Sequence, residues 1–233
     1  MTAELVVLDP AAFGPLAARR VAAELRAVLR TQARCSLGLS GGSTPRPIYQ
    51  QLAAEHPDGE LWSRVDLYFA DERCVPPGDP ASNYRMVKEW LLDLVPLDPD
   101  RVHRMAGERA DQDEAARDYE RVLPERLDLL LLGLGADGHT ASLFPEASSL
   151  AESRRRVLAV PAPKPPHDRL TVTPPVIRGA GLTIGLVSGA DKSAAVARVI
   201  DGPFDPLRTP GQLARNGLWI VDTAAAAQLE ARR

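Results

Sequence analysis

The chain has 233 residues, of which 45% are hydrophobic and 25% charged, and a formal net charge of −3. This composition is ordinary for a globular protein, and we expect a single α/β domain over residues 1–233. The lack of a basic excess argues against a nucleic-acid partner. No apolar run is long enough to span a membrane, and the N-terminus lacks a basic segment followed by an apolar one. We therefore expect a cytoplasmic protein.

Short apolar segments alternate with segments of helical periodicity in the first half of the chain. In order, they predict a strand at 5–8, a helix at 13–30, a strand at 35–39, a helix at 45–54, a strand at 65–70 and a helix at 82–94. Pro45 suits the first helical position, because the N–H that proline lacks has no partner there. Ser82 is a typical N-cap.

The second half continues the alternation. It predicts a helix at 111–122, strands at 127–132, 157–160, 170–173 and 182–187, a helix at 189–200, a strand at 218–221 and a short alanine-rich helix after it. This order predicts a Rossmann-like α/β fold, with a mostly parallel sheet and helices on both faces. Proline-rich loops at 76–80 and 161–166 are interpreted as rims or lids, not domain boundaries.

Neither the cysteines nor any other cluster indicates a metal site. Cys35 and Cys74 lie in or beside predicted strands and lack CxxC spacing, so we expect buried free thiols in a reducing compartment. No group of His, Cys and carboxylates has the spacing of a metal-ligand set.

A glycine-rich loop follows the predicted strand at 35–39. Gly41, Gly42, Ser43 and Thr44 supply backbone N–H groups and hydroxyls before a helix N-terminus, which favours phosphate binding. A tight turn with an N-cap is the alternative. Residues 38–42 also fit the G-x-S-x-G pattern of an esterase, with Ser40 as the nucleophile.

Two acids and an arginine end the predicted strand at 65–70. Arg73 follows Asp71 and Glu72, and a guanidinium can grip a phosphate or a developing oxyanion with two hydrogen bonds. The other interpretation is a local ion pair of Arg73 with Asp71 or Glu72, and both can hold at once, because a carboxylate often fixes a substrate-binding guanidinium.

The most informative segment is the apolar run at 127–132 and the glycine-rich turn after it. The turn carries Asp137 and His139 to the carboxyl end of a buried strand, where open α/β sheets bind ligands. His139 is the candidate general base, because imidazole accepts a proton near neutral pH. The dinucleotide pattern at 133–138 is a weak match, since Pro145 follows too soon for a long helix.

Lys192 is one of only three lysines and follows the predicted strand at 182–187. A cation at a helix start is opposed by the helix dipole, which points to an anionic ligand nearby. A solvent-exposed lysine is the alternative.

Taken together, these loops resemble the 6-phosphogluconolactonases. The matching segments are residues 40–45, 71–76 with 82–84, 133–145, 169–175, the Gly189-x-x-Lys192 turn, and Leu218-Trp219 followed by Asp222. The resemblance runs over residues 35–230 in the family's order. Residues 140–145 and the position of Arg73 are the most lactonase-like.

The resemblance implies hydrolysis of 6-phospho-D-glucono-1,5-lactone without a cofactor. His139 would deprotonate the attacking water, Asp137 would orient the imidazole, and Arg73 would stabilise the oxyanion or hold the phosphate. The remaining substrate contacts would come from the 41–44 loop, Arg169 and Lys192. Nothing requires more than a monomer or a partner beyond the sugar phosphate.

Three other functions stay open on the sequence alone. A glucosamine-6-phosphate deaminase/isomerase shares this fold and a similar strand-end Asp-Gly-His. A non-catalytic sugar-phosphate-binding protein would use the same loops. A Ser40 esterase would need a later acid and a histidine, which Asp71 or Asp137 and His139 or His167 supply in order, although Asp137 and His139 are close in sequence for the usual separate loops.

Overall fold

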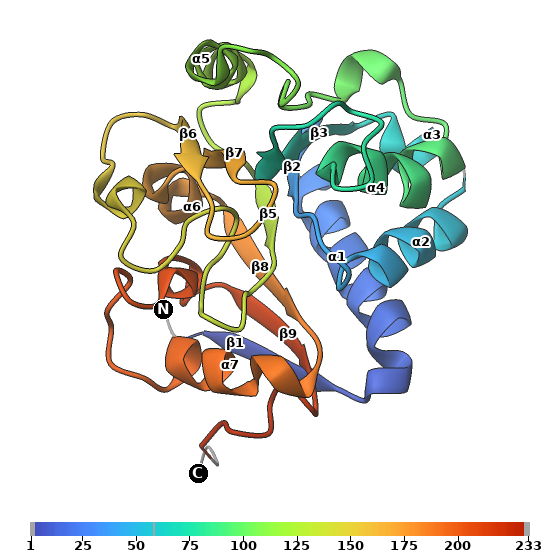
Figure 1. Ribbon diagram of the computed structural model, residues 1–233. Coiled ribbons are helices and arrows are strands. Elements are labelled where there is room, and N and C mark those ends of the chain that lie inside the picture. The colour runs from blue at the N-terminus through green and yellow to red at the C-terminus, as the bar shows by residue number, and fades with distance from the viewer. Residues whose placement is uncertain (1–2, 58, 231–233) are drawn as a thin grey trace.

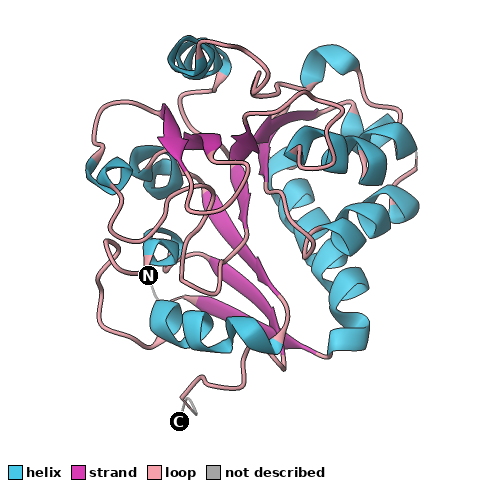
Figure 2. Ribbon diagram, viewed as in Figure 1, coloured by secondary structure: helices cyan, strands magenta, loops and turns pink. Residues whose placement is uncertain are grey.

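The computed structural model describes residues 3–57 and 59–230. Its main sheet is entirely parallel and has the strand order β1-β9-β8-β5-β2-β3 (Figures 1 and 2). Its strands are β1 (Glu4–Leu8), β2 (Cys35–Leu39), β3 (Val65–Phe69), β5 (Leu129–Leu132), β8 (Leu182–Val187) and β9 (Leu218–Asp222). The predicted Rossmann-like α/β fold is confirmed.

Helices flank this sheet on both sides. They are α1 (Phe13–Leu29), α2 (Arg46–Glu55), α3 (Gly59–Trp62), α4 (Asn83–Trp90), α5 (Gln112–Val122), α6 (Pro174–Gly179) and α7 (Ser193–Ile200). Right-handed crossovers place helices on opposite faces when the chain moves along the sheet in opposite directions. The connections β1-α1-β2 and β2-α2-β3 move one way and β8-α7-β9 the other, and Figure 1 shows α1 and α2 together and α7 across the sheet from them.

A second, antiparallel sheet stands at the carboxyl ends of the parallel strands. Its order is β4 (Asp71–Arg73), β7 (Asp168–Val172) and β6 (Val157–Pro161). Ala70 joins the two sheets, because its N–H donates to Leu39 in β2 and its carbonyl accepts from Val172 in β7. The sequence pattern predicts β6 and β7 but treats residues 71–73 as a loop, since the pairing that makes them a strand comes from β7, about 100 residues away in the chain.

The element ends differ from prediction in three places. The helix predicted at 82–94 ends at Trp90, and residues 92–94 form a separate 3₁₀ turn. The helix predicted at 189–200 begins with a 3₁₀ turn, Ala190–Lys192, before α7. The alanine-rich helix after residue 221 is wrong: residues 223–228 form turns. Asp222 there accepts the Ala225 N–H, and a segment this short gains too little to propagate a helix.

The core lies between the parallel sheet and its helices. All four residues of β5 are buried, as are Trp62, Trp219 and Tyr49. Cys35 and Cys74 are free thiols as predicted, but only Cys35 is fully buried. No helix of the described residues has the length and hydropathy needed to cross a membrane. That residues 1–233 form one domain stays a prediction.

Gly185 in β8 generates the first testable prediction. A Cβ at this position would lie 2.4 Å from Cε3 of the fully buried Trp219 in β9. Gly185→Ala is expected to lower the free energy of unfolding by about 1–3 kcal/mol, because a rigid indole within a packed core cannot move aside freely. Urea denaturation measures the change.

The matched control is Gly179→Ala, at the exposed end of α6, where a Cβ meets no atom within 4 Å. Its stability should equal or slightly exceed the wild type's. Equal stabilities for the two variants would contradict the packing argument.

Candidate active site

The parallel strands β2 and β5 are neighbours in the sheet, and between them the order in which the chain adds strands across the sheet reverses. From β2 the chain continues to β3 on one side, and from β5 it continues to β8 on the other. At such a switch point the two loops leave in opposite directions and open a crevice between the carboxyl ends of the strands. The two loops are the glycine-rich segment at 40–45 and the Asp137–His139 turn. The topology therefore brings together two segments that are about 95 residues apart in the chain.

Asp137 and His139 form a hydrogen-bonded pair in the turn after β5. The distance from His139 Nδ1 to Asp137 Oδ1 is 2.6 Å, and the same carboxylate oxygen accepts the backbone N–H of His139 at 3.1 Å. These bonds to His139 lower the pKa of the Asp137 carboxyl to about 2. An ionised carboxylate at Nδ1 keeps the neutral imidazole's proton on that nitrogen and leaves Nε2 free to accept one.

Glycines make this turn possible. A Cβ at Gly135 would lie 2.0 Å from His139 Nδ1 and 2.5 Å from Asp137 Oδ1, so any side chain there would displace the pair. Gly138 has φ +97°, a conformation that side chains disfavour, and its carbonyl accepts the N–H of Gly211 at 2.9 Å. The ring of Phe144 lies 4.9 Å from the imidazole, centroid to centroid, and the imidazole remains one-third exposed.

Arg73 and Arg169 are directly opposite each other in the β4–β7 pair. Neither makes an ion pair with a described residue: Arg73 Nη1 donates to the carbonyl of Ala81 at 2.6 Å, and Arg169 Nε donates to that of Pro166 at 2.9 Å. Burial lowers the pKa of Arg169, and the positive charge of Arg73 lowers it further. Two adjacent guanidiniums that carry no carboxylate partner can bind a multiply charged anion such as phosphate.

Glu72 answers the question that the sequence left open at Arg73. Its carboxylate is buried and accepts the N–H groups of Arg73, Asn83 and Tyr84 at 2.6–2.7 Å, with the Ser82 hydroxyl at 3.1 Å. Burial raises the pKa of this carboxyl, although the three backbone donors oppose the rise. Glu72 thus secures the start of α4, and the predicted alternative of an ion pair with Arg73 is wrong.

The geometry of residues 40–44 favours phosphate binding by the loop over catalysis by Ser40 as an esterase nucleophile. Gly42 has φ +98°, and a Cβ at Gly41 would meet Asn83 Oδ1 at 1.8 Å, so both glycines are required. Ser43 is exposed, and Thr44 is partly so. Ser40 is 4% exposed and its hydroxyl has no partner among the described residues, so no base activates it as a nucleophile.

Lys192 ends the 3₁₀ turn after β8, not the first turn of an α-helix. Its ammonium lies 3.3 Å from the exposed Asp191 carboxylate. The turn is held by the buried Asp222, whose carboxylate accepts the Ser188 hydroxyl at 2.5 Å and the Gly189 N–H at 3.0 Å. Because β8 is next to β5 in the sheet, Lys192 flanks the histidine turn on the side opposite the 41–44 loop.

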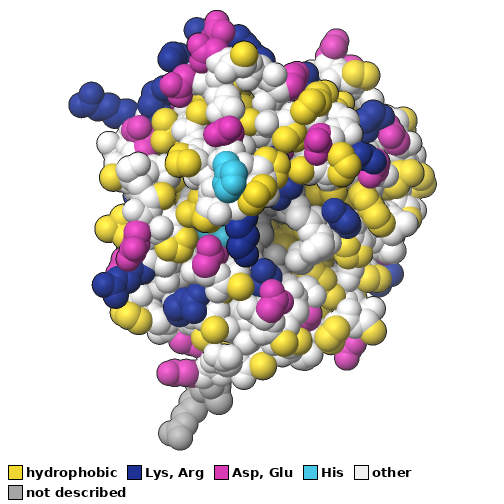
Figure 3. All heavy atoms as spheres, in the orientation of Figure 1, with side chains coloured by type: hydrophobic (Ala, Val, Ile, Leu, Met, Phe, Trp, Pro, Cys, Tyr) yellow, Lys and Arg dark blue, Asp and Glu magenta, His cyan; other side chains and the backbone are white. Residues whose placement is uncertain are grey.

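Figure 3 shows this face of the molecule with a hollow near its centre, and Lys or Arg side chains and a histidine lie beside it. The described residues contain no group of three or more His, Cys, Asp or Glu arranged to hold a metal ion. The groups gathered at this face are an imidazole with its carboxylate, guanidiniums and backbone N–H groups.

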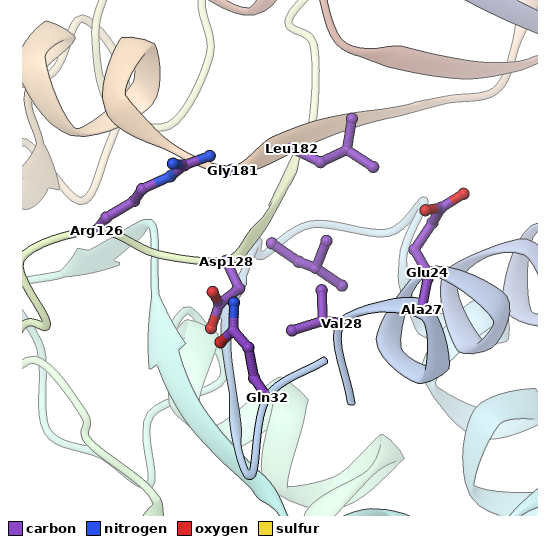
Figure 4. A pocket seen from close by; sticks show the side chains of 9 residues that line it. Glu24, Ala27, Val28, Gln32, Arg126, Asp128, Gly181 and Leu182 are labelled. Carbon is purple, nitrogen blue, oxygen red and sulfur yellow. The ribbon is translucent and has the colours of Figure 1, made fainter. Parts of the chain in front are cut away.

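A separate depression of about 340 Å³ lies at the other end of the strands, where β5 and β8 begin (Figure 4). Its acidic side chains are already engaged: Asp128 accepts from Ser36, and Glu24 pairs with Arg20. These two carboxylates are therefore not available to a ligand.

Four residues connect these loops inside the protein: Asp71, Asn83, Ser142 and Thr171. The sequence analysis considered Asp71 only as an ion-pair partner of Arg73 or as the acid of an esterase, and it assigned no role to the other three. Asn83 and Ser142 lie in segments that carry the family resemblance. The available signal was the alternation in Asp71-Glu72-Arg73 and Arg169-Leu170-Thr171, which places alternate side chains on one face once the segments are recognised as strands.

Comparison with known proteins finds relatives that are similar in sequence and in fold. The family model described as "Glucosamine-6-phosphate isomerases/6-phosphogluconolactonase" matches residues 9–220. A 6-phosphogluconolactonase of Streptomyces coelicolor is 38% identical, over 98% of this chain and 95% of its own. The structure of the Trypanosoma cruzi 6-phosphogluconolactonase is 27% identical, with a TM-score of 0.85 over 99% of both chains. A monomeric glucosamine-6-phosphate deaminase, 22% identical with a TM-score of 0.83 over 97% of this chain and 99% of its own, shares the fold.

The paired guanidiniums predict binding of inorganic phosphate. Phosphate should raise the melting temperature, because a ligand that binds only the folded state stabilises it. Arg169→Met removes one charge-assisted contact of about 1.5–3 kcal/mol and should weaken phosphate binding about 10- to 100-fold. Arg121→Met is the control, since Arg121 lies exposed on α5 and pairs with Asp118. Equal phosphate-induced stabilisation of both variants would contradict the assignment.

Proposed function

The chain belongs to the family of glucosamine-6-phosphate isomerases and 6-phosphogluconolactonases, and we propose from this that it hydrolyses 6-phospho-D-glucono-1,5-lactone to 6-phospho-D-gluconate. This is a step of the oxidative pentose phosphate pathway. The single observation that carries the mechanism is the Asp137–His139 pair at the switch point, with a bond of 2.6 Å, Gly135 before the pair and Gly138 between its two members.

In this mechanism, His139 Nε2 takes a proton from a water molecule as the water oxygen attacks the lactone carbonyl carbon. The carbonyl π electrons move to oxygen and form a tetrahedral oxyanion. Collapse of the oxyanion breaks the bond to the ring oxygen, and the imidazolium returns its proton to that leaving oxygen. The products are a carboxylic acid, which ionises, and a free hydroxyl. Asp137 stabilises the intervening imidazolium and holds the ring by its Nδ1 proton.

The positive groups around this pair supply the remaining requirements. Arg73 and Arg169 have no carboxylate partner in the described part of the chain and would bind the phosphate dianion or the oxyanion. The 41–44 loop and Lys192 flank the histidine turn on its two sides and would contact the phosphate and hydroxyls. The enzyme we propose is a cytoplasmic monomer whose partner is the small sugar-phosphate substrate.

The assignment of His139 as the base can be tested by mutation. The protein should accelerate acid release from freshly made 6-phosphogluconolactone above the spontaneous rate, without added metal. His139→Ala should lower kcat about 10²- to 10⁴-fold and leave KM nearly unchanged, because general-base catalysis acts on the transition state. The control is His103→Gln, since His103 stacks on Tyr68 beside β3 and lies outside the site.

Two results would be informative in the other direction. A near-normal rate in His139→Ala would contradict the base assignment alone. No acceleration by the wild-type protein would contradict the lactonase proposal, and ammonia release from glucosamine 6-phosphate would then be measured.

The second prediction uses the low pKa of Asp137, about 2. A carboxyl whose pKa is lower in the folded protein contributes its bond fully above the ordinary value near 3.8, and the bond is lost as the pH falls towards 2. Asp137 therefore stays ionised throughout the range in which activity is assayed, and loss of rate between pH 7 and 5 reflects protonation of another group.

Asp137→Asn should lower kcat roughly 10²- to 10⁴-fold, because an amide at Nδ1 no longer fixes the productive tautomer. An unchanged kcat would contradict the role of Asp137.

A further inference from the structure

Ser142 connects the histidine turn to the second sheet. It lies three residues after His139 and is 1% exposed. Its hydroxyl donates to Asp71 Oδ2 at 2.7 Å, and its backbone N–H donates to Thr171 Oγ1 at 3.1 Å. Asp71 and Thr171 are direct partners in the antiparallel β4–β7 pair. One residue of the turn is thus bonded to both strands of that pair.

The face that receives Ser142 is also the face that carries the two arginines. Side chains two residues apart in a strand share a face, so Asp71 and Arg73 point the same way, as do Arg169 and Thr171. In the observed register, Asp71 is opposite Thr171 and Arg73 is opposite Arg169. The two residues that Ser142 contacts are therefore the nearest neighbours of the arginines on this face, two residues away along each strand.

Asp71 is itself held firmly. Its second carboxylate oxygen accepts Asn83 Nδ2 at 3.0 Å, and the same amide donates to the Asp71 carbonyl at 2.9 Å. Asp71 is 7% exposed and makes no ion pair with a described residue, so removing either neutral donor leaves a buried carboxylate oxygen unpaired. Asn83 in turn packs against Gly41 of the phosphate loop.

The backbone between His139 and Ser142 is in an unfavourable conformation. Ala141 has φ +48°, in the left-handed region that residues with a Cβ seldom occupy. Such a conformation persists only where the surrounding contacts enforce it, and the contacts next to it are the two hydrogen bonds of Ser142.

We propose that Ser142, through Asp71 and Thr171, is a positioning residue that sets the separation between the imidazole of His139 and the Arg73–Arg169 pair. This rests on the proposed function. The carbonyl carbon and the phosphate of the substrate are joined covalently, so a base and an anion site that bind both must keep a matching separation. Misplacement of a reacting group by about 1 Å is enough to lower a rate 10²-fold.

The experiment compares Ser142→Ala and Thr171→Val with Thr171→Ser, which keeps the accepting hydroxyl. Ser142→Ala and Thr171→Val should each lower kcat about 10- to 100-fold and leave the affinity for inorganic phosphate within twofold of wild type. Thr171→Ser should restore most of kcat. Ser149→Ala is the matched control, because Ser149 is also buried but its hydroxyl has no partner among the described residues.

Two results would overturn the proposal: a kcat within twofold of wild type in both Ser142→Ala and Thr171→Val, or a fall in phosphate affinity that parallels the fall in kcat, since the arginine pair itself would then be displaced. If Ser142→Ala fails to fold, Thr171→Val and Thr171→Ser still decide the question.

Hydrogen exchange separates this proposal from the proposed function. If the wild-type protein does not hydrolyse the lactone, the proposed function fails. Amide exchange still tests whether the hydrogen bonds of Ser142 to Asp71 and Thr171 hold the histidine turn in place. Exchange of residues 139–143 should be faster in Thr171→Val, with exchange in β7 unchanged. Unchanged exchange in residues 139–143 would show that these hydrogen bonds do not hold the turn, and would overturn the proposal.

Discussion

The pairing of β2 with β5 is the contact on which the rest of this structure depends. It joins Leu37 to Leu129 and Gly38 to Leu130, and a Cβ at Gly38 would lie 2.6 Å from the Leu130 side chain. Only glycine allows that close approach. Because the chain leaves β2 in one direction and β5 in the other, their loops diverge and leave room between them for a ligand. The histidine turn and the 41–44 loop follow these two neighbouring strands and flank this crevice for this reason.

Buried carboxylates organise the loops around this crevice without taking part in the reaction directly. Glu72 accepts three backbone N–H groups at the start of α4, and Asp222 holds the turn that carries Lys192. Asp71 joins Ser142 to Asn83. A carboxylate accepts several donors from different segments, which an apolar side chain cannot do. Each buried acid thus fixes the position of a loop that carries a functional group.

The exposed pair, Asp137 and His139, has a different character. Its carboxylate is half exposed and bonds chiefly to the imidazole, so its charge acts on the base. Within residues 3–57 and 59–230 no carboxylate pairs with Arg73 or Arg169, so their charge remains available to a ligand. The imidazole with its counter-charge is therefore separate from the two guanidiniums, and the reaction that we propose uses the first as a base and the second as an anion site.

The sequence alone determined the α/β fold and most strands, and it predicted the candidate site residues. It could do so because buried parallel strands are apolar runs, and because Asp137, His139 and the 41–44 loop directly follow such runs. The tertiary structure decided which loops meet, since strand order depends on pairing between distant segments. It made a strand of residues 71–73 and left the alanine-rich end in turns, because β7 in one case and Asp222 in the other outweighed local propensity. It also placed Arg169 opposite Arg73 and bonded Ser142 to Asp71, contacts between residues 96 and 71 positions apart that no local pattern encodes.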